Sequence, residues 1–402
     1  MSHLYDAPPK HGIYSLVVAA APPLDALSVG PLGPRLARIH TCIRHYFEGV
    51  ERIAAALYDE KSDRLKTFVD STDGGSPLEH YEAALADVPS LLELARSGRP
   101  RVVDDLAVFR DSPAEHSIRL LERGYRSSYA LPLRDGDRLW GFLFFDSAAA
   151  GYFRPAVTER LEVFGQMVAA ILAQSIAPIR LLHQSLRMLS TLTHYRDPET
   201  LGHLERMSRY SRLIAQDLAR QTGRSDEYVE FLFLFAPVHD VGKIAIPDAV
   251  LFKDGPLTED EFEVMKGHAT KGGEIVDLLV TDLGLEAFPH IDVLRNVVRL
   301  HHEAVDGSGY PLRLAGDAIP LEARIVAVAD VFDALTSRRR YKQGWRSDEA
   351  LRYLRERAGR QFEPECVDAL QARMEEADAV RLLFPDAGDD PYQSREGYAS
   401  DL

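Results

Sequence analysis

The hydrophobic pattern divides the chain into a first part with strand-like runs and a second part that is helical throughout. In the first part, two pairs of short apolar or alternating runs flank polar turns: residues 53–58 with 65–69, and residues 127–133 with 139–145. The second pair is separated by Arg-Asp-Gly-Asp-Arg, in which Asp-Gly supplies the turn. Because strand-length runs around a polar turn are typical of hairpins, the pattern predicts two antiparallel β-hairpins.

Helical segments are expected around these hairpins. A helix is expected from Ile39, two short helical pieces at residues 81–86 and 90–96, and a further helix at residues 112–122. The dipeptide Ser112-Pro113 would cap and begin the last of these helices. Strands mixed with helices in this way predict an α+β domain built on an antiparallel sheet.

A long connecting helix is predicted at residues 160–192, with a bend at Pro178. Apolar residues recur there at helical spacing, at Val163, Met167, Ile171 and Leu172. An apolar stripe of this kind is typical of an interdomain or dimer seam. The pattern then stays helical to residue 384, with loops at residues 197–198, near Pro247 and at residues 306–320, and this predicts an all-α domain.

At 402 residues the chain exceeds the usual size of one hydrophobic core, so two main domains are expected. The predicted parts are a lead segment at 1–36, an α+β domain at 37–174, a connecting helix at 160–192, an all-α domain at 190–384 and a tail at 385–402. The tail is acidic and polar, and we expect it to be disordered.

Net charge and cysteine content exclude several classes of function. The net charge of −15 argues against a broad electrostatic surface for DNA or anionic membranes. A small anion needs only a local cluster of cations, and residues 338–342 form the densest basic run. Cys42 and Cys366 suggest neither a disulfide framework nor a thiolate zinc site, and no run approaches the roughly 18 apolar residues of a membrane span. We expect a soluble cytoplasmic protein.

The candidate chemistry lies in the second part, where seven of the fourteen histidines fall within residues 193–302. Glu199 and His203 are four residues apart, which places both on one face of a helix. The pair His239-Asp240 ends an apolar run, and an ionised carboxylate there needs a cation or a metal. The other candidates are His268, His301, His302 and Asp330. Each alone has an ordinary explanation, such as a surface hydrogen bond or a buried acid, but together they indicate a metal site.

Four stretches of this part resemble the HD-GYP domain, a bacterial branch of the HD phosphohydrolase superfamily. They are residues 196–203, 239–248, 301–311 and 329–337, and the third contains Gly309-Tyr310-Pro311. The resemblance covers about residues 190–384. One departure is Ala304-Val305, where the family usually has large or basic residues; it removes no ligand residue.

The resemblance implies a complete set of metal ligands and a substrate site. The implied ligands are Glu199, His203, His239, Asp240, His268, His301, His302 and Asp330. The implied catalytic residues are His239, Asp240 and Lys243, and the implied substrate contacts are Lys243, Arg339, Lys342, Gly309, Tyr310 and Pro311. Glu199 favours three metal ions over two, and a set of imidazoles and carboxylates suits iron or manganese.

The first part, about residues 30–174, resembles a GAF domain, a sensory module that often binds a small molecule or dimerises. The resemblance rests on the order of strands and helices, without a sharp motif. His80 and His116 receive no role, because isolated histidines are usually ordinary surface or core residues. Ligand sensing and a ligand-free dimerisation role both stay open, and the connecting helix is a candidate dimer seam.

The implied activity is hydrolysis of cyclic di-GMP to linear pGpG, and further to GMP, by hydroxide that the metal ions activate. Two alternatives are a cyclic GMP-AMP phosphodiesterase and a non-catalytic receptor for a cyclic dinucleotide. The complete ligand set argues against the receptor. A nucleotide phosphohydrolase of the wider superfamily is disfavoured by the Gly-Tyr-Pro loop and the adjacent pair His301-His302.

Overall fold

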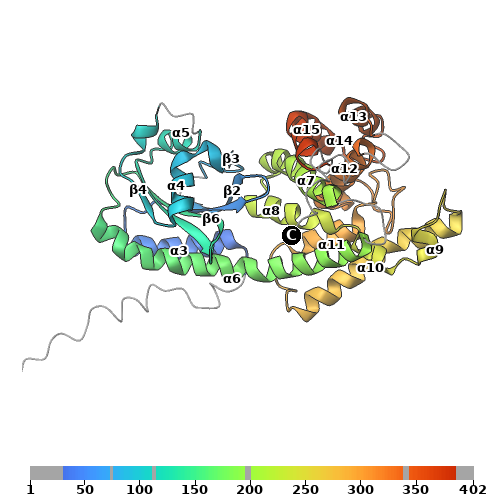
Figure 1. Ribbon diagram of the computed structural model, residues 1–402, viewed down its shortest axis with the longest axis horizontal. Helices are drawn as coiled ribbons and strands as arrows, with labels where there is room; N and C mark the ends of the chain where they lie inside the picture. Colours follow the sequence, from blue (N-terminus) through green and yellow to red (C-terminus); the bar gives the residue numbers. More distant parts are fainter. Residues whose placement is uncertain (1–29, 73–75, 111–114, 195–200, 338–343, 386–402) are drawn as a thin grey trace, which may run out of the picture. The chain divides into compact units, whose positions relative to one another are not determined.

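The computed structural model describes residues 30–72, 76–110, 115–194, 201–337 and 344–385 (Figure 1). It divides into two compact units, Met1–Ser175 and Ile176–Leu402, and each is considered by itself. Most of the predicted lead segment, the predicted start of a helix at Ser112-Pro113 and the predicted tail lie outside the described residues.

The first unit is built on one antiparallel sheet of six strands in the order β3-β2-β1-β6-β5-β4. Both predicted hairpins are confirmed, because β1 pairs with β2 and β5 pairs with β6. The strands are β1 Arg52–Asp59, β2 Arg64–Thr72, β3 Glu82–Ala84, β4 Arg101–Val103, β5 Ser127–Asp135 and β6 Arg138–Ser147.

Helices cover both faces of this sheet. Leu91 and Leu94 of α4 share a buried cluster with Phe142 of β6. Helix α6 (Pro155–His194) packs against the other face, because a Cβ added at its Gly165 would lie 2.3 Å from Leu131 of β5. Leu131 precedes Pro132, the partner of Phe142 in the sheet, and neighbouring strand residues point to opposite faces. The helices of this unit are α3 Leu32–Tyr46, α4 Pro89–Ser97 and α5 Glu115–Glu122, with 3-10 turns η1 Leu85–Asp87 and η2 Leu106–Phe109.

Two expectations for this unit are wrong. The helical piece at residues 81–86 is instead strand β3 followed by η1, because the backbone of residues 82–84 pairs with the edge of β2. A three-residue strand is too short to show an alternating pattern. The first helix begins at Leu32 rather than Ile39, so the predicted lead segment extends too far.

Helix α6, Pro155–His194, continues from the first unit into the second and contains Pro178. The segment Pro155–Leu189 of this helix is long and apolar enough to cross a membrane by length and composition alone, because an 18-residue window within it has a mean hydropathy of 1.4. No such stretch was expected from the sequence, because Gln, Ser and Gly interrupt its apolar residues. That window is 33% buried, and Ile179, Leu182 and Leu186 of the helix are fully buried in the core of the second unit.

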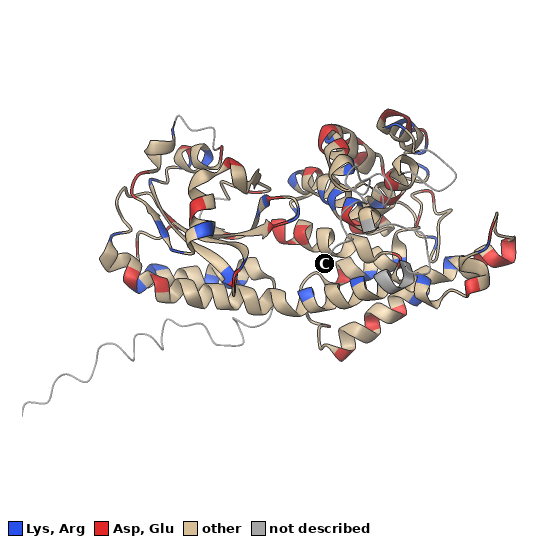
Figure 2. Ribbon diagram, in the orientation of Figure 1, with Lys and Arg blue, Asp and Glu red and all other residues tan. Residues whose placement is uncertain are grey.

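The second unit is helical, and its described residues form no strand longer than an isolated bridge. Basic and acidic residues are interspersed along its helices (Figure 2). Its elements are α7 Leu201–Thr222, α8 Asp226–Phe235, η3 Ala236–Val238, η4 Val241–Ala245, α9 Asp248–Leu251, α10 Glu259–Asp282, α11 Ile291–Leu300, η5 Gly316–Ala318, α12 Leu321–Thr336, α13 Ser347–Glu356, α14 Pro364–Ala372 and α15 Met374–Leu383.

One hydrophobic core joins these helices and fixes the elements that carry the candidate site. Buried residues of α7, α8, α11 and α12 belong to a single cluster, including Tyr210, Phe235, Val297 and Phe332. The ring of Tyr210 lies edge-on against that of Phe332, with 5.2 Å between centroids. Helices α7 and α12 are therefore held side by side, and both carry candidate ligands.

Candidate metal centre and adjoining cleft

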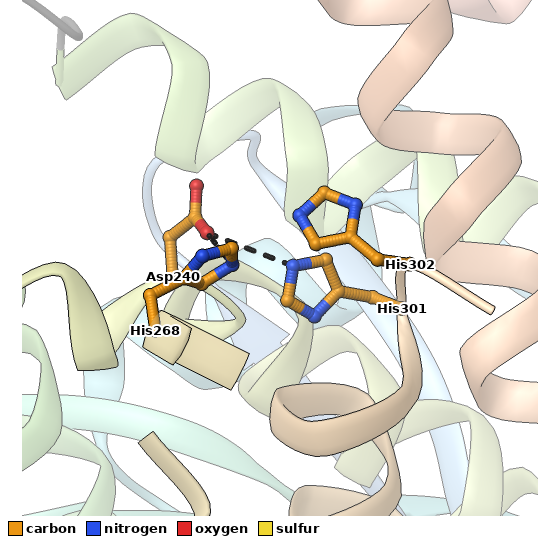
Figure 3. Close-up of side chains that lie close together, drawn as sticks. All are labelled: Asp240, His268, His301 and His302. Atoms are coloured by element: carbon orange, nitrogen blue, oxygen red, sulfur yellow. Dashed lines mark ion pairs between the residues drawn. The ribbon is translucent and has the colours of Figure 1, made fainter. Parts of the chain in front are cut away.

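Five elements bring seven of the predicted ligand residues together. His203 comes from α7, His239 and Asp240 from the junction of η3 and η4, His268 from α10, His301 and His302 from the end of α11, and Asp330 from α12. They form two groups, one of Asp240, His268, His301 and His302 and one of His203, His239 and Asp330. Within each group the ligand atoms lie within 4.8 Å of one another, and Figure 3 shows the first group converging.

Backbone carbonyls fix the orientation of three imidazoles. Nδ1 of His239, His268 and His301 lies 2.9, 2.7 and 2.9 Å from the carbonyl oxygens of Ala236, Met265 and Val297. A carbonyl oxygen only accepts, so Nδ1 carries the proton in each ring. The Nε2 lone pair of each neutral imidazole is then available to a metal ion, which is the usual arrangement of metal-binding histidines.

The first group leaves buried polar atoms without hydrogen bonds. Nε2 of His268 and of His301 lie 3.1 and 3.6 Å from Oδ1 of Asp240 (Figure 3). All three atoms are buried, and none has a hydrogen-bond partner within the described part of the chain. Buried polar atoms are rarely left in this state, and a divalent cation between them would satisfy all three. The residues present therefore fit a metal ion.

The ionisation states of this group also suit a cation. Burial lowers the pKa of His301, and it lowers that of His302 well below its ordinary value, so both imidazoles are held in the neutral form that binds a metal. Burial alone would raise the pKa of Asp240. The positive charge of Lys243, whose Nζ lies 2.9 Å from Oδ2, is the main influence that instead holds this pKa well below the usual range.

A close backbone approach places Asp240 beside His268. Gly242, two residues after Asp240, packs directly on α10: a Cβ there would lie 1.9 Å from the carbonyl oxygen of His268 and 2.4 Å from the nitrogen of Gly272. Only glycine allows this contact, because any side chain would push η4 away from α10. The glycine therefore sets the separation of two candidate ligands.

A buried ion pair that the sequence analysis did not single out supports His203. Nδ1 of His203 lies 2.8 Å from Oδ2 of Asp333, and Arg206 Nε and Nη2 donate to the same carboxylate at 2.5 and 2.9 Å. Burial raises the pKa of Asp333, but the hydrogen bonds from His203 and Arg206 outweigh it and lower the pKa to about 2. The sequence spacing could have indicated this pair, because Arg206 lies three residues after His203 and Asp333 three residues after Asp330, which places each on the same helix face as a candidate ligand.

A cleft with a volume of about 1020 Å³ adjoins the candidate ligands. His301, His302 and Asp330 line it, together with the predicted substrate residues Gly309, Tyr310 and Pro311. The ring of Tyr310 stacks at a tilt on that of His302, with 4.7 Å between centroids. Of the remaining predicted site residues, Lys243 contacts Asp240, whereas Glu199, Arg339 and Lys342 lie outside the described residues.

Comparison with known families identifies both parts of the chain. Residues 187–366 match the HD domain family, and residues 43–176 match the GAF domain family. The chain combines a GAF domain with an HD domain. The two resemblances drawn from the sequence are confirmed, and the candidate metal centre lies within the HD domain.

Curated relatives match about half of the chain. The chain is 51% identical over 187 residues to the cyclic di-GMP phosphodiesterase response regulator RpfG of Xanthomonas campestris, covering 46% of this chain and 47% of that protein. It is 41% identical to a cyclic di-GMP phosphodiesterase of Vibrio cholerae, covering 50% and 41%. It is 37% identical to the 3'3'-cGAMP-specific phosphodiesterase 2 of the same organism, covering 49% and 36%. The chain spans about half the length, or less, of these relatives.

Proposed function

We propose that the HD domain is a metal-dependent phosphodiesterase that hydrolyses cyclic di-GMP to linear pGpG and further to GMP. The observation that carries this proposal is the convergence of seven imidazole and carboxylate side chains into two groups at a cleft. The names of the relatives add support, since several are cyclic di-GMP phosphodiesterases.

HD-domain phosphodiesterases are metal-dependent, and the two groups would hold one divalent ion each. Glu199 would add a ligand for a third ion. Nitrogen and oxygen ligands without thiolates favour iron or manganese. The ions would neutralise charge on the phosphate and make water acidic enough to act as the nucleophile near neutral pH.

The chain's own residues would orient the substrate and hold its charge. Lys243 places an ammonium group next to Asp240, where it can bind a phosphate oxygen, and Arg339 and Lys342 are proposed to contribute further cations. Burial raises the pKa of Tyr310 well above its ordinary value, so its hydroxyl stays protonated and can donate a hydrogen bond in the cleft. The second ester bond would be cleaved in the same place when pGpG rebinds.

A specific observation keeps cyclic GMP-AMP as a second candidate substrate, because three relatives are named as specific for it. The direct test incubates iron-loaded or manganese-loaded protein anaerobically with each dinucleotide and resolves linear and mononucleotide products by chromatography. Faster turnover of cyclic di-GMP supports the proposal, and faster turnover of cyclic GMP-AMP moves it to the second substrate. Binding without products would favour the receptor alternative.

We further propose that the GAF domain regulates this activity, through a small-molecule ligand or as part of a dimer, in the cytoplasm. The sequence contains only two cysteines, Cys42 and Cys366, which is too few for a disulfide framework and suits a reducing compartment. No membrane association is proposed.

Helix α6 is the proposed dimer seam, because it exposes apolar residues at heptad spacing. Val163, Met167, Leu181 and Met188 are between 53% and 66% exposed, and the last three are separated by multiples of seven residues. Residues at this spacing lie on one face of a helix, as the seam residues of a coiled coil do. We expect sedimentation at micromolar concentration to give the mass of a dimer, and Leu181→Glu to give that of a monomer. A monomeric mass for the unaltered protein would contradict the seam.

A further inference from the structure

The cleft contains an aromatic pair next to the candidate metal centre. The rings of Phe262 on α10 and Tyr310 in the Gly-Tyr-Pro loop meet edge to face with 6.5 Å between centroids, and both line the cleft. Nζ of Lys266 lies 5.3 Å from the centroid of the Phe262 ring and 5.7 Å from that of Tyr310. Phe262 is 48% exposed, so its ring is accessible to a ligand in the cleft.

A turn between α13 and α14 brings an arginine to the same cleft. Arg360 and Gln361 line the cleft, and their carbonyl oxygens accept hydrogen bonds from the backbone nitrogens of Asp306 and Val305 at 2.8 and 3.4 Å. These bonds hold the turn against the loop that carries Tyr310. These backbone bonds fix the position of Arg360, and its side chain remains exposed.

The guanidinium of Arg360 is the better candidate for a ligand contact than its neighbour Arg357. Within the part of the chain that the structure describes, Arg360 forms no ion pair. Its influence on Asp306 is weak: the pKa of Asp306 is lowered mainly by hydrogen bonds from Ser308, and the charge of Arg360 adds to this from a distance. Arg357 instead stacks on Tyr353, with 3.6 Å from its guanidinium carbon to the ring centroid, and donates to the Tyr353 carbonyl.

We propose that Arg360 and the ring pair Phe262–Tyr310 form a subsite for one guanine base of the dinucleotide. Guanine presents two acceptors, N7 and O6, that match the donor fork of arginine, whereas adenine has an amino donor in place of O6. Aromatic rings supply the surface on which a base stacks. The subsite rests on the proposed function and narrows its substrate class to dinucleotides with at least one guanine, which includes cyclic di-GMP and cyclic GMP-AMP and disfavours cyclic di-AMP.

The test compares hydrolysis of cyclic di-GMP and cyclic di-AMP by the metal-loaded full chain and its Arg360 variants. Bidentate recognition of a base discriminates by a factor on the order of ten to a hundred. Arg360→Ala is expected to raise KM for cyclic di-GMP by about tenfold or more with kcat little changed, and to reduce the preference over cyclic di-AMP by a similar factor. Arg352→Ala, an exposed arginine of α13 outside the cleft, is the matched control and should behave as the unaltered protein.

Two further variants separate base recognition from charge and from packing. Arg360→Lys keeps the positive charge but not the two parallel N–H donors of the guanidinium, so it should lose the guanine preference almost as Arg360→Ala does. A lysine variant that keeps the full preference for cyclic di-GMP would overturn the proposal. Phe262→Ala should raise KM for both dinucleotides, because stacking does not depend on the base. Its control is Phe252→Ala, which removes an aromatic ring that is 39% exposed and does not line the cleft.

Failure of the subsite and failure of the proposed function give different results. Turnover of cyclic di-GMP with an unchanged preference in Arg360→Ala removes the subsite and leaves the phosphodiesterase. If no dinucleotide is hydrolysed, the subsite is tested instead by measuring the affinities for cyclic di-GMP and cyclic di-AMP by calorimetry. The subsite is supported if the unaltered protein binds cyclic di-GMP more tightly than cyclic di-AMP and Arg360→Ala loses this preference. Equal affinity of the unaltered protein for both dinucleotides overturns the subsite.

Discussion

Replacing Asp240 by asparagine is expected to remove bound metal and to lower hydrolysis of cyclic di-GMP by at least about a thousandfold. Asp240 belongs to one ligand group, and its Oδ2 also lies 3.3 Å from Nε2 of His239 in the other group, so both depend on its charge. Metal ions contribute several kcal/mol to the stabilisation of the transition state, and each 1.36 kcal/mol is a factor of ten in rate. His239→Ala should give the same result.

Elemental analysis of the purified variants and chromatography of their products measure the two effects separately. Asp292→Asn on α11 is the matched control, because it removes one carboxylate that is 82% exposed and outside both groups. The control should keep its metal and its turnover. An Asp240→Asn variant that retains full metal content and activity would show that the two groups are not the metal centre.

Replacing Arg206 by alanine is expected to destabilise the HD domain by about 3–5 kcal/mol. Arg206 is 2% exposed and Asp333 1%, so the variant would leave a carboxylate buried without its main cationic partner. Arg206 also donates to the carbonyl oxygen of Phe384 and to Ser337 Oγ, and both bonds would be lost. The shift in the unfolding transition, measured by scanning calorimetry on the full chain, should exceed about 6 °C.

Two controls separate the buried pair from a general effect of losing an arginine. Arg220→Ala removes an exposed arginine from the same helix and should shift the transition by about 1 °C or less. The double variant Arg206→Met, Asp333→Leu should recover much of the stability lost in Arg206→Ala, because no charge is left buried. Equal stability of Arg206→Ala and the unaltered protein would contradict the importance of the pair.

The fold could be predicted wherever the sequence pattern is longer than a few residues. The two hairpins and helix α6 follow from alternation, turn residues and helical spacing. Strands β3 and β4 have three residues each and exist only because β2 and β5 offer them a partner, so no local pattern indicates them. The early start of α3 was missed because Pro and Gly residues obscure its first turn, although proline is acceptable there.

The candidate site could be predicted as a set of residues but not as a geometry. Motifs indicated the ligand residues, and the structure brings together all of those that it describes. The partition into two groups and the carbonyls that orient the histidines depend on how helices pack, which spacing alone does not give. Arg360 escaped notice for the same reason, because it reaches the cleft only through the hydrogen bonds between two loops distant in sequence.

The most direct test of the account follows cyclic di-GMP hydrolysis by one preparation of the full chain, first stripped of metal by a chelator and then reloaded anaerobically with manganese or iron. We predict no pGpG from the stripped protein, and recovery of turnover in proportion to the metal that elemental analysis finds bound. Hydrolysis that is equally fast without metal, or a fully loaded protein that binds cyclic di-GMP and never cleaves it, would contradict a metal-dependent phosphodiesterase.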